Sequence, residues 1–494
     1  MLLFTVVSVL LFAPALQGLW SFRTQFLLEA AVFLTGGFWL FRELLAGRVP
    51  VFLTDKRNIP LFCAAFCSLL AALLSPVRTL VLPEWWNFAL GLFLLALSGS
   101  LSAGETRGTD LALRCSAWFM GLLALYQAFV LKNPEISASL TNPNALAFFT
   151  LLLLPLAVMW KDFFLLAVLT FVLIWTKSAA ALLALSVAAG FYVSENMRAG
   201  EFKKRWPFLL VFAAAAGLAI SQLDYRSFLD RLGWWHAALR MFADRPALGF
   251  GAGAFTYVYP AYHTAQTGGV ATIYAHNYYL EFLAENGFFA FVFWFWAIAL
   301  RFRDIAGLRK YAVIAALAHS VADFGLTVPA NFFVFCYILG EQDPPATVKS
   351  GPSENRRIGR SAVIVAAAAS LCCFLYLCGV FVTQLKLERL HEKALSAVSA
   401  GDHGGAEKLI ETAALLAPGN PLVPELLGRI RMRQGLEQKD AGRMFSAAAN
   451  LERAAAMNPY NAGAWRELER LYSEAGERRL LEGLRKRKAE IFKY

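Results

Sequence analysis

The chain has 494 residues, of which 58% are hydrophobic and 16% are charged, and its formal net charge is +11. Soluble domains carry about a quarter charged residues, so a water-soluble core cannot absorb this much apolar surface and the bilayer must solvate most of the chain. The Lys and Arg residues cluster in short loops between apolar runs, which indicates membrane topology rather than a nucleic-acid-binding face.

The N-terminal apolar run, residues 1–16, lacks the basic segment that opens a secretory signal peptide, and further apolar runs follow it at once. We therefore expect it to be the first membrane span. The seven cysteines lie in or beside apolar runs and form no Cys-x-x-Cys pair. This spacing predicts neither a disulfide framework nor a zinc site.

The apolar runs predict an all-α polytopic bundle of about 12 to 13 spans, because a helix needs about 20 mostly apolar residues to cross a bilayer. The segment 329–341 is short enough to be re-entrant instead. The predicted spans are residues 1–18, 26–45, 59–76, 86–101, 115–131, 144–160, 162–177, 179–194, 206–222, 286–302, 310–326, 329–341 and 361–384.

The basic residues predict which side of the membrane each loop faces, because Lys and Arg accumulate in cytoplasmic loops. With a cytoplasmic N-terminus, the short outer loops contain only Arg23, Arg78, Lys132 and Lys177. The long loop 224–285 and the region after residue 384 then face the periplasm of a bacterial inner membrane. The predicted inner loops carry Arg42, Arg48, Lys56, Arg57, Arg107, Arg114, Lys161, Arg198, Lys203, Lys204, Arg205, Arg301, Arg303, Arg309, Lys310, Lys349, Arg356, Arg357 and Arg360.

The loop 224–285 is long among very short ones, and such loops often carry function. Its first part places Arg231, Trp235, Leu239 and Phe242 on one helical face, which predicts a helix on the membrane surface that ends before Pro246. The glycine run 249–253 follows. It has two interpretations, a phosphate cradle or a tight turn that permits close packing.

Basic and titratable side chains gather in the same loop. Arginine suits bidentate recognition of phosphate, and an imidazole that titrates near neutral pH suits general-base work. Arginines in an outer loop oppose the usual charge asymmetry, so they predict either a phosphorylated substrate or contacts with lipid headgroups. The residues are Arg226, Arg231, Arg240, Arg245, His263 and His276.

The pair His319 and Asp323 lies one turn apart inside the predicted span 310–326. Ionisable groups at membrane depth are costly and usually functional. We therefore include both among the candidate site residues.

The region 385–494 is charged, Ala-rich and helical in period, which predicts a soluble domain after a membrane domain of residues 1–384. Two similar segments, 415–421 and 455–461, end one amphipathic helix and start the next. They resemble tetratricopeptide repeats, whose period is about 34 residues; the longer spacing here predicts an insertion near residues 438–443. An unrelated helical hairpin domain is the alternative, and either one is more typical of partner binding than of catalysis.

Several motifs within residues 115–340 resemble those of the bacterial O-antigen ligase and O-antigen polymerase family, and the most specific lies in the long loop. The motifs are Arg231 to Trp235; Met241-Phe242-x-Asp244-x-Pro246-x-Leu248-Gly249-x-Gly251-x-Gly253-x-Phe255; His276-Asn277 with nine residues before Gly287; Asn142-Pro143-Asn144-Ala145-Leu146-Ala147; and His319-Ser320-x-x-Asp323-Phe324.

The resemblance implies transfer of a glycan from an undecaprenyl-pyrophosphate carrier to lipid A–core, another glycan or a protein, with inversion and with neither metal nor other cofactor. The absence of an Asp-x-Asp pair from the predicted outer loops fits a metal-free reaction. His276 is the expected general base and Arg231 the expected pyrophosphate ligand. Further substrate contacts are expected from Arg240, Arg245, Lys177, Asn142, Asn144, Asn277, Glu281, His319 and Asp323.

Two positions depart from the family pattern. Lys177 stands where relatives often carry arginine, and Ala290 stands where they carry a second glycine. A lysine keeps the charge without the bidentate fork, so these positions bear on how the carrier is bound. The expected partners are the carrier-linked donor, the acceptor, membrane lipids and a protein bound by the C-terminal repeats, without nucleic acid.

Two other functions compete with glycan transfer. A transporter or flippase for lipid-linked glycans accounts for His319 and Asp323 but not for the Arg- and His-rich loop, and no inverted repeat is evident. A membrane-anchored scaffold accounts for the C-terminal region but again not for the loop. The sequence does not distinguish ligase from polymerase, or one sugar or acceptor from another.

Overall fold

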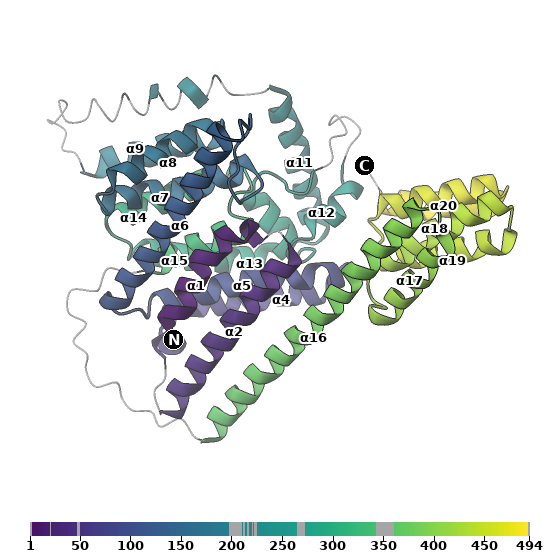
Figure 1. Ribbon diagram of the computed structural model, residues 1–494, viewed down its shortest axis with the longest axis horizontal. Helices are drawn as coiled ribbons and strands as arrows, with labels where there is room; N and C mark the ends of the chain where they lie inside the picture. The colour runs from purple at the N-terminus through teal and green to yellow at the C-terminus, as the bar shows by residue number, and fades with distance from the viewer. Residues whose placement is uncertain are drawn as a thin grey trace.

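The computed structural model describes residues 2–19, 21–46, 50–196, 225–263, 272–341 and 360–492, together with short stretches between residues 210 and 221. In these regions every regular element is a helix (Figure 1), as the predicted all-α class requires. The predicted span 206–222 lies largely outside the described residues. So do some of the basic residues that orient the chain, Arg48, Arg198, Lys203, Lys204, Arg205, Lys349, Arg356 and Arg357.

Six helices of the described chain are long and apolar enough to cross a membrane. They are α2 (Phe22–Leu45), α4 (Ile59–Leu73) with the 3₁₀ turn before it, α5 (Arg78–Ser98), α6 (Ala103–Phe129), α9 (Ala179–Asn196) and α13 (Tyr278–Phe302). Shorter apolar helices are α1 (Leu2–Ala15), α7 (Pro143–Met159), α8 (Phe163–Trp175) and α15 (Pro329–Gly340). A multi-pass membrane domain is thereby confirmed, and the total of about 12 to 13 spans stays a prediction.

The bundle buries its central helices and exposes large apolar side chains on its outside. In α15, every residue from Ala330 to Gly340 is buried. On the outer surface Phe66 is 60% exposed and Phe164 is 82% exposed. Wide exposure of phenylalanine suits contact with lipid, since a water-soluble surface avoids large apolar patches.

Two predicted span boundaries are wrong because the chain breaks the helix at special residues. The span predicted at 310–326 corresponds to α14 (Gly307–His319), which ends early, so Asp323 lies in the turn that leads to α15 and not inside a helix. Pro329 begins the next helix there. Helix α13 begins at Tyr278, eight residues before the predicted 286, and its backbone breaks at Gly287, where φ is 73° and ψ is 177°.

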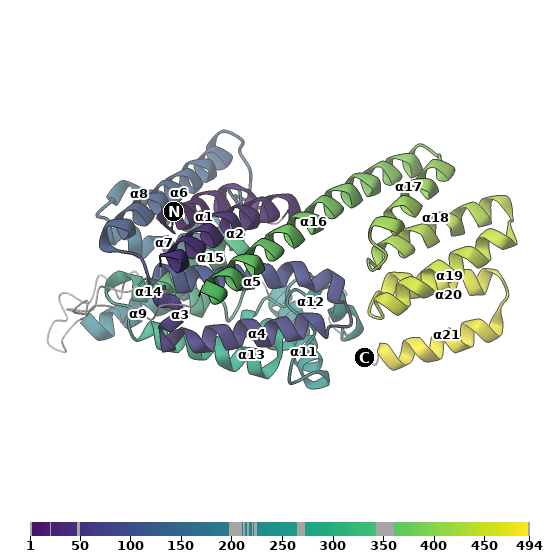
Figure 2. The same ribbon diagram turned by 90° about the horizontal axis from the view of Figure 1, so that it is seen from below.

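The longest helix, α16 (Arg360–Ser399), connects the bundle with the C-terminal helices (Figures 1 and 2). It packs along α2 and then against α17, and Arg23 Nε pairs with Glu388 Oε2 at 2.6 Å. The domain boundary predicted at residues 384–385 therefore lies within a continuous helix.

The C-terminal helices are α17 (His403–Leu416), α18 (Leu422–Gln438), α19 (Ala441–Met457), α20 (Ala462–Glu474) and α21 (Arg478–Ile491), and they pack as successive antiparallel neighbours (Figure 2). The insertion predicted near residues 438–443 is wrong. Only Lys439 and Asp440 separate α18 from α19, and Lys439 has a φ of 54°. Each of these two helices has 17 residues, so the longer spacing comes from helix length.

Ion pairs join the first C-terminal helices. Glu407 on α17 accepts from Arg431 Nε at 2.7 Å and from Arg443 Nη1 at 3.1 Å. Desolvation raises the pKa of the Glu407 carboxyl, but the hydrogen bonds from the two arginines outweigh it and hold the pKa below its usual range. This carboxylate therefore ties α17, α18 and α19 together.

Candidate active site

The glycine run of the long loop interlocks with the break in α13. A Cβ added at Gly249, whose φ is +67°, would lie 2.4 Å from the carbonyl oxygen of Glu285. A Cβ added at Gly287 would lie 2.3 Å from the carbonyl oxygen of Ala247. Gly251 N donates to Glu285 O at 2.6 Å across the same contact. Of the two interpretations of the glycine run, close packing is the one that this geometry supports.

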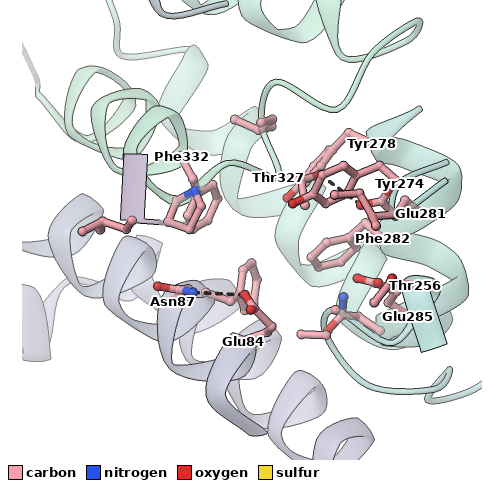
Figure 3. Close-up of a pocket in the computed structure, with 18 of the residues that line it drawn as sticks. Glu84, Asn87, Thr256, Tyr274, Tyr278, Glu281, Phe282, Glu285, Thr327 and Phe332 are labelled. Carbon is pink, nitrogen blue, oxygen red and sulfur yellow. Dashed lines mark hydrogen bonds between the residues drawn. The ribbon is translucent and has the colours of Figure 1, made fainter. Parts of the chain in front are cut away.

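The buried carboxylates of Glu281 and Glu285, both on α13, accept hydrogen bonds from the loop and so fix it against this helix (Figure 3). Glu281 Oε2 accepts from Ala275 N at 2.6 Å, and its Oε1 accepts from Thr327 Oγ1 at 3.1 Å. Glu285 Oε1 accepts from Phe255 N at 2.8 Å. Both side chains are buried, so these bonds satisfy groups that water does not reach. Glu281 therefore fixes the backbone immediately before His276.

His276 lies in a constrained turn between the loop and α13. Its φ is 51°, in the left-handed region that few non-glycine residues adopt. The ring stacks on Trp234 with centroids 5.0 Å apart, and Trp235 Nε1 donates to the His276 carbonyl oxygen at 3.4 Å. The next residue, Asn277, caps α13 by accepting from Leu280 N at 3.1 Å. Strained backbone held in this way is typical of functional sites.

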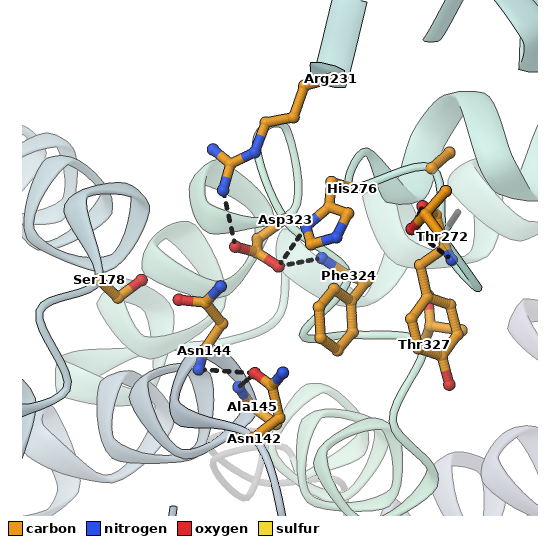
Figure 4. A network of polar contacts seen from close by, with 12 residues as sticks. Asn142, Asn144, Ala145, Ser178, Arg231, Thr272, His276, Asp323, Phe324 and Thr327 are labelled. Atoms are coloured by element: carbon orange, nitrogen blue, oxygen red, sulfur yellow. Dashed lines mark hydrogen bonds and ion pairs between the residues drawn. The ribbon is translucent and has the colours of Figure 1, made fainter. Parts of the chain in front are cut away.

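Asp323 joins the two residues that the sequence singles out (Figure 4). Its Oδ1 lies 3.3 Å from His276 Nδ1, and its Oδ2 lies 3.6 Å from Arg231 Nη2. Phe324 N donates to Oδ1 at 2.8 Å. The Asp323 side chain is only 1% exposed, against 18% for His276 and 21% for Arg231. A buried carboxylate thus holds a histidine and an arginine that both reach the surface of the site.

Side-chain nitrogen atoms of this cluster remain able to bond to a substrate. The Asp323 carboxylate lies within ion-pair distance of Nδ1 of His276, so Nε2 is the ring nitrogen left to accept a proton from a substrate, as in other base–orienter pairs. Arg231 Nε is buried without a hydrogen-bond partner among the described residues. A guanidinium with donors unsatisfied is suited to an anionic oxygen. The cluster can therefore combine proton removal with stabilisation of a leaving phosphate.

Helix α11 (Tyr225–Asp244) carries Arg231 into the site and ends just before Pro246, as predicted. Its buried face consists of Gly233, Trp234, Ala237, Ala238 and Met241. On the face predicted to lie on the membrane surface, Leu239 is 45% exposed; Arg240, outside that face, is half-buried. Arg245 braces the turn instead of facing the cluster, since its Nη1 lies 3.4 Å from the carbonyl oxygens of Leu74 and Gly249.

His319 lies beneath the cluster. It is fully buried, its ring meets Phe148 edge to face at 5.3 Å, and neither ring nitrogen has a hydrogen-bond partner within the described part of the chain. A further loop histidine, His263, packs on Tyr259 with ring centroids 5.2 Å apart. Burial lowers the pKa of His263, and Asp230 partly opposes this shift.

The candidate residues on the earlier helices differ in whether their side chains point toward the cluster. Asn142 caps α7, with Oδ1 accepting from Asn144 N at 2.8 Å. The Asn144 amide and the Ser178 hydroxyl point toward the space beside Arg231 and Asp323 (Figure 4). Lys177 is exposed at the end of α8 with a φ of 54°.

Sequence reasoning did not single out Trp234 or Phe324, the two rings that hold His276 in place. Phe324 meets the His276 ring edge to face at 4.9 Å. Trp234 was visible only as half of a tryptophan pair, and Phe324 only as the residue after Asp323. No local signal marks either as a neighbour of His276, because both contacts are tertiary.

The fold and the site define a multi-pass helical membrane protein with a histidine, an aspartate and an arginine gathered at one loop. A family model for O-Antigen ligase matches residues 164–295, a segment that contains Arg231 and His276 and stops short of Asp323. The match supports a glycosyltransferase-like enzyme, a glycan ligase or polymerase in general. A comparison with curated proteins finds no match.

Proposed function

We propose that the protein transfers a glycan from undecaprenyl pyrophosphate to a hydroxyl group of lipid A–core, another glycan or a protein, at the periplasmic face of the bacterial inner membrane. The observation that carries this proposal is the Arg231–Asp323–His276 cluster. It pairs a candidate base with a cation for an anionic leaving group. The family match over the same loop supports the class of reaction.

In the proposed step, the acceptor oxygen bonds to the anomeric carbon as the bond from that carbon to the pyrophosphate oxygen breaks. The hydroxyl proton passes to Nε2 of His276, and the bonding electrons leave with the pyrophosphate beside Arg231. Attack opposite the leaving group inverts the anomeric configuration. A positioned base contributes about 10²- to 10⁴-fold to such a step. Arg231 supplies the positive charge that a metal-free and cofactor-free reaction requires.

The remaining candidate residues have supporting roles in this proposal. Asn144, Lys177 and Arg240 are assigned to the donor, while Asn277 and Glu281 position the His276 turn. Asn142 acts through the start of α7 and Arg245 through the glycine turn. The C-terminal helices are proposed to form a tetratricopeptide-like domain that binds a partner protein or selects the acceptor.

The proposal is tested by mass spectrometry of envelope glycoconjugates in a deletion strain complemented with variants. Complementation with His276→Ala should leave the defect of the deletion, while the exposed His236→Ala on α11 should restore the wild-type products. Loss of all capped core would identify a ligase, and a single repeat unit left on the core would identify a polymerase. Full restoration by His276→Ala would refute the assignment of the base.

A further inference from the structure

A cavity of about 260 Å³ lies beside the Arg231–Asp323–His276 cluster, between α5, α13 and the glycine turn (Figure 3). Pockets for drug-sized ligands measure about 300–1,000 Å³, so this one suits a single ring. Its walls contain both aromatic and acidic side chains. No Lys, Arg or His is found among its lining residues, all of which belong to the described chain.

The aromatic walls of the cavity are flat and close to one another. Phe88 stacks on Phe332 with centroids 5.8 Å apart and meets Phe282 at 5.3 Å. Tyr257 and Tyr274 line the side next to the loop. Aromatic faces carry partial negative charge and attract the C–H face of a sugar ring. Such walls give a saccharide apolar contact without excluding its hydroxyl groups.

Two of the three acidic side chains already have structural partners. Glu281 and Glu285 accept from the loop at the bonds described above. Glu84 differs, because its side chain is exposed to open space and only its Oε2 has a described partner, Asn87 Nδ2 at 3.1 Å. The Glu84 carboxylate thus retains Oε1 for a ligand.

Asn87 provides the independent sign of a ligand. The residue is only 6% exposed and lines the cavity, yet its Oδ1 has no hydrogen-bond partner in the described regions. A buried acceptor without a donor is costly, and an ordered water or a ligand hydroxyl group would satisfy it. Glu84 Oε1 and Asn87 Oδ1 can each accept a hydrogen bond, and sugar hydroxyl groups can donate one.

The cavity adjoins the proposed base through one layer of side chains. Tyr274 lines the cavity and stacks on Phe324 at 4.5 Å, and Phe324 meets His276 at 4.9 Å. In Figure 4, Thr327, which also lines the cavity, lies on the opposite side of Phe324 from Arg231. The cationic group and the cavity therefore lie on opposite sides of Phe324.

This separation decides which substrate the cavity suits. A pyrophosphate would find a cation at Arg231 and none in the lining of this cavity. Burial raises the pKa of Tyr274, and Glu84, Glu281 and Glu285 raise it further, so the phenol stays neutral. Glu84 and Asn87 are thus the lining groups suited to hydroxyl groups.

We propose that this cavity binds a neutral sugar ring of the acceptor, with Glu84 and Asn87 accepting hydrogen bonds from its hydroxyl groups. The assignment to the acceptor rests on the proposed function, whereas sugar binding itself does not. It gives the reaction a donor side at Arg231 and an acceptor side at Glu84.

The test is saturation-transfer NMR on the full-length protein in nanodiscs, with a panel of neutral methyl hexosides as probes. At least one hexoside should bind the wild-type protein, and Glu84→Gln and the near-isosteric Asn87→Leu should each weaken it about tenfold or more. Glu135→Gln, at an exposed loop position, is the matched control and should bind as the wild type does. His276→Ala should also bind the hexoside, since the base is not part of the cavity.

Equal binding by the wild type and both cavity variants would overturn the proposal. Preferential binding of cationic methyl glucosaminide would also overturn it, because it would identify an ammonium site. Turnover separates the two proposals, because Glu84→Gln should raise the acceptor KM. Hexoside binding together with full turnover by His276→Ala would leave this site standing and refute the proposed base.

Discussion

Replacing Asp323 by asparagine removes one charge from the centre of the site and conserves its shape. The carboxylate lies 3.3 Å from His276 Nδ1 and 3.6 Å from Arg231 Nη2, and it is 1% exposed. At an effective dielectric constant of about 20, charges about 4 Å apart interact by about 4 kcal/mol. The asparagine amide also permits the wrong tautomer of the histidine, whose Nε2 then carries a proton and cannot act as base.

We expect Asp323→Asn to lower the rate of donor consumption by about 10²- to 10⁴-fold, the contribution of a positioned general base. The assay is single-turnover release of labelled polyprenyl pyrophosphate by purified protein at saturating acceptor, so that binding does not limit the rate. The matched control is Asp304→Asn, at a side chain 40% exposed that pairs with Arg57 away from the site. A rate within threefold of the wild type for Asp323→Asn, with normal folding, would show that Asp323 does not orient His276.

Four further predictions concern the scaffold and its orientation. Gly287→Ala should lower the thermal unfolding temperature in detergent, because its Cβ would meet the Ala247 carbonyl at 2.3 Å and its φ is +73°; an unchanged temperature would contradict the interlock. The stability that Glu407 contributes is present above its unfolded pKa of about 4.3 and is lost as pH falls through its lower folded pKa. The hydrogen-exchange protection of α17 and α18 in the full chain, relative to the intrinsic exchange rate at each pH, should therefore fall in that acid range. Glu407→Gln should remove this step. Alkaline phosphatase fused after Gln384 should be active, whereas an inactive fusion there and an active one after Gly340 would show that the late spans are miscounted. Truncation after Lys386 should leave donor consumption measurable, and its complete loss in a folded protein would refute a dispensable C-terminal region.

The membrane helices and the two central site residues could be predicted from the sequence. Apolar runs mark the spans because the bilayer imposes length and composition on each one. His276 and Arg231 are singled out by loop motifs that resemble those of the O-antigen ligase and polymerase family, and their roles stay predictions. Both signals are local in the sequence, so they can be recognised without knowledge of the tertiary packing.

The partner of His276 could not be predicted, because the contact joins residues far apart in the chain. Asp323 appeared to lie inside a span, one helical turn after His319. The helix ends at His319, and the turn that follows brings the carboxylate to His276 and Arg231. Between His319 and Gly325 the sequence has neither glycine nor proline, so no local signal marks the end of the helix at His319.

The acidic cavity and the C-terminal spacing were missed for similar reasons. Glu84 and Asn87 lie within an apolar helix, and nothing local shows that Glu84 faces open space or that Asn87 Oδ1 has no donor among the described residues. The distance between the two repeat-like segments was assigned to an inserted loop. Two long helices joined at Lys439 and Asp440 account for it instead.

The central claim is that the loop cluster makes a glycosidic bond, and the most direct measurement uses purified protein, labelled polyprenyl-pyrophosphate-linked glycan and an acceptor. The wild type should release polyprenyl pyrophosphate and form a glycoside of inverted configuration at equal rates. Arg231→Ala should abolish both products, and Arg231→Lys should restore little, because the charge returns without the bidentate fork. Wild-type rates of product formation by Arg231→Ala, or carrier movement without any new glycoside, would contradict the account.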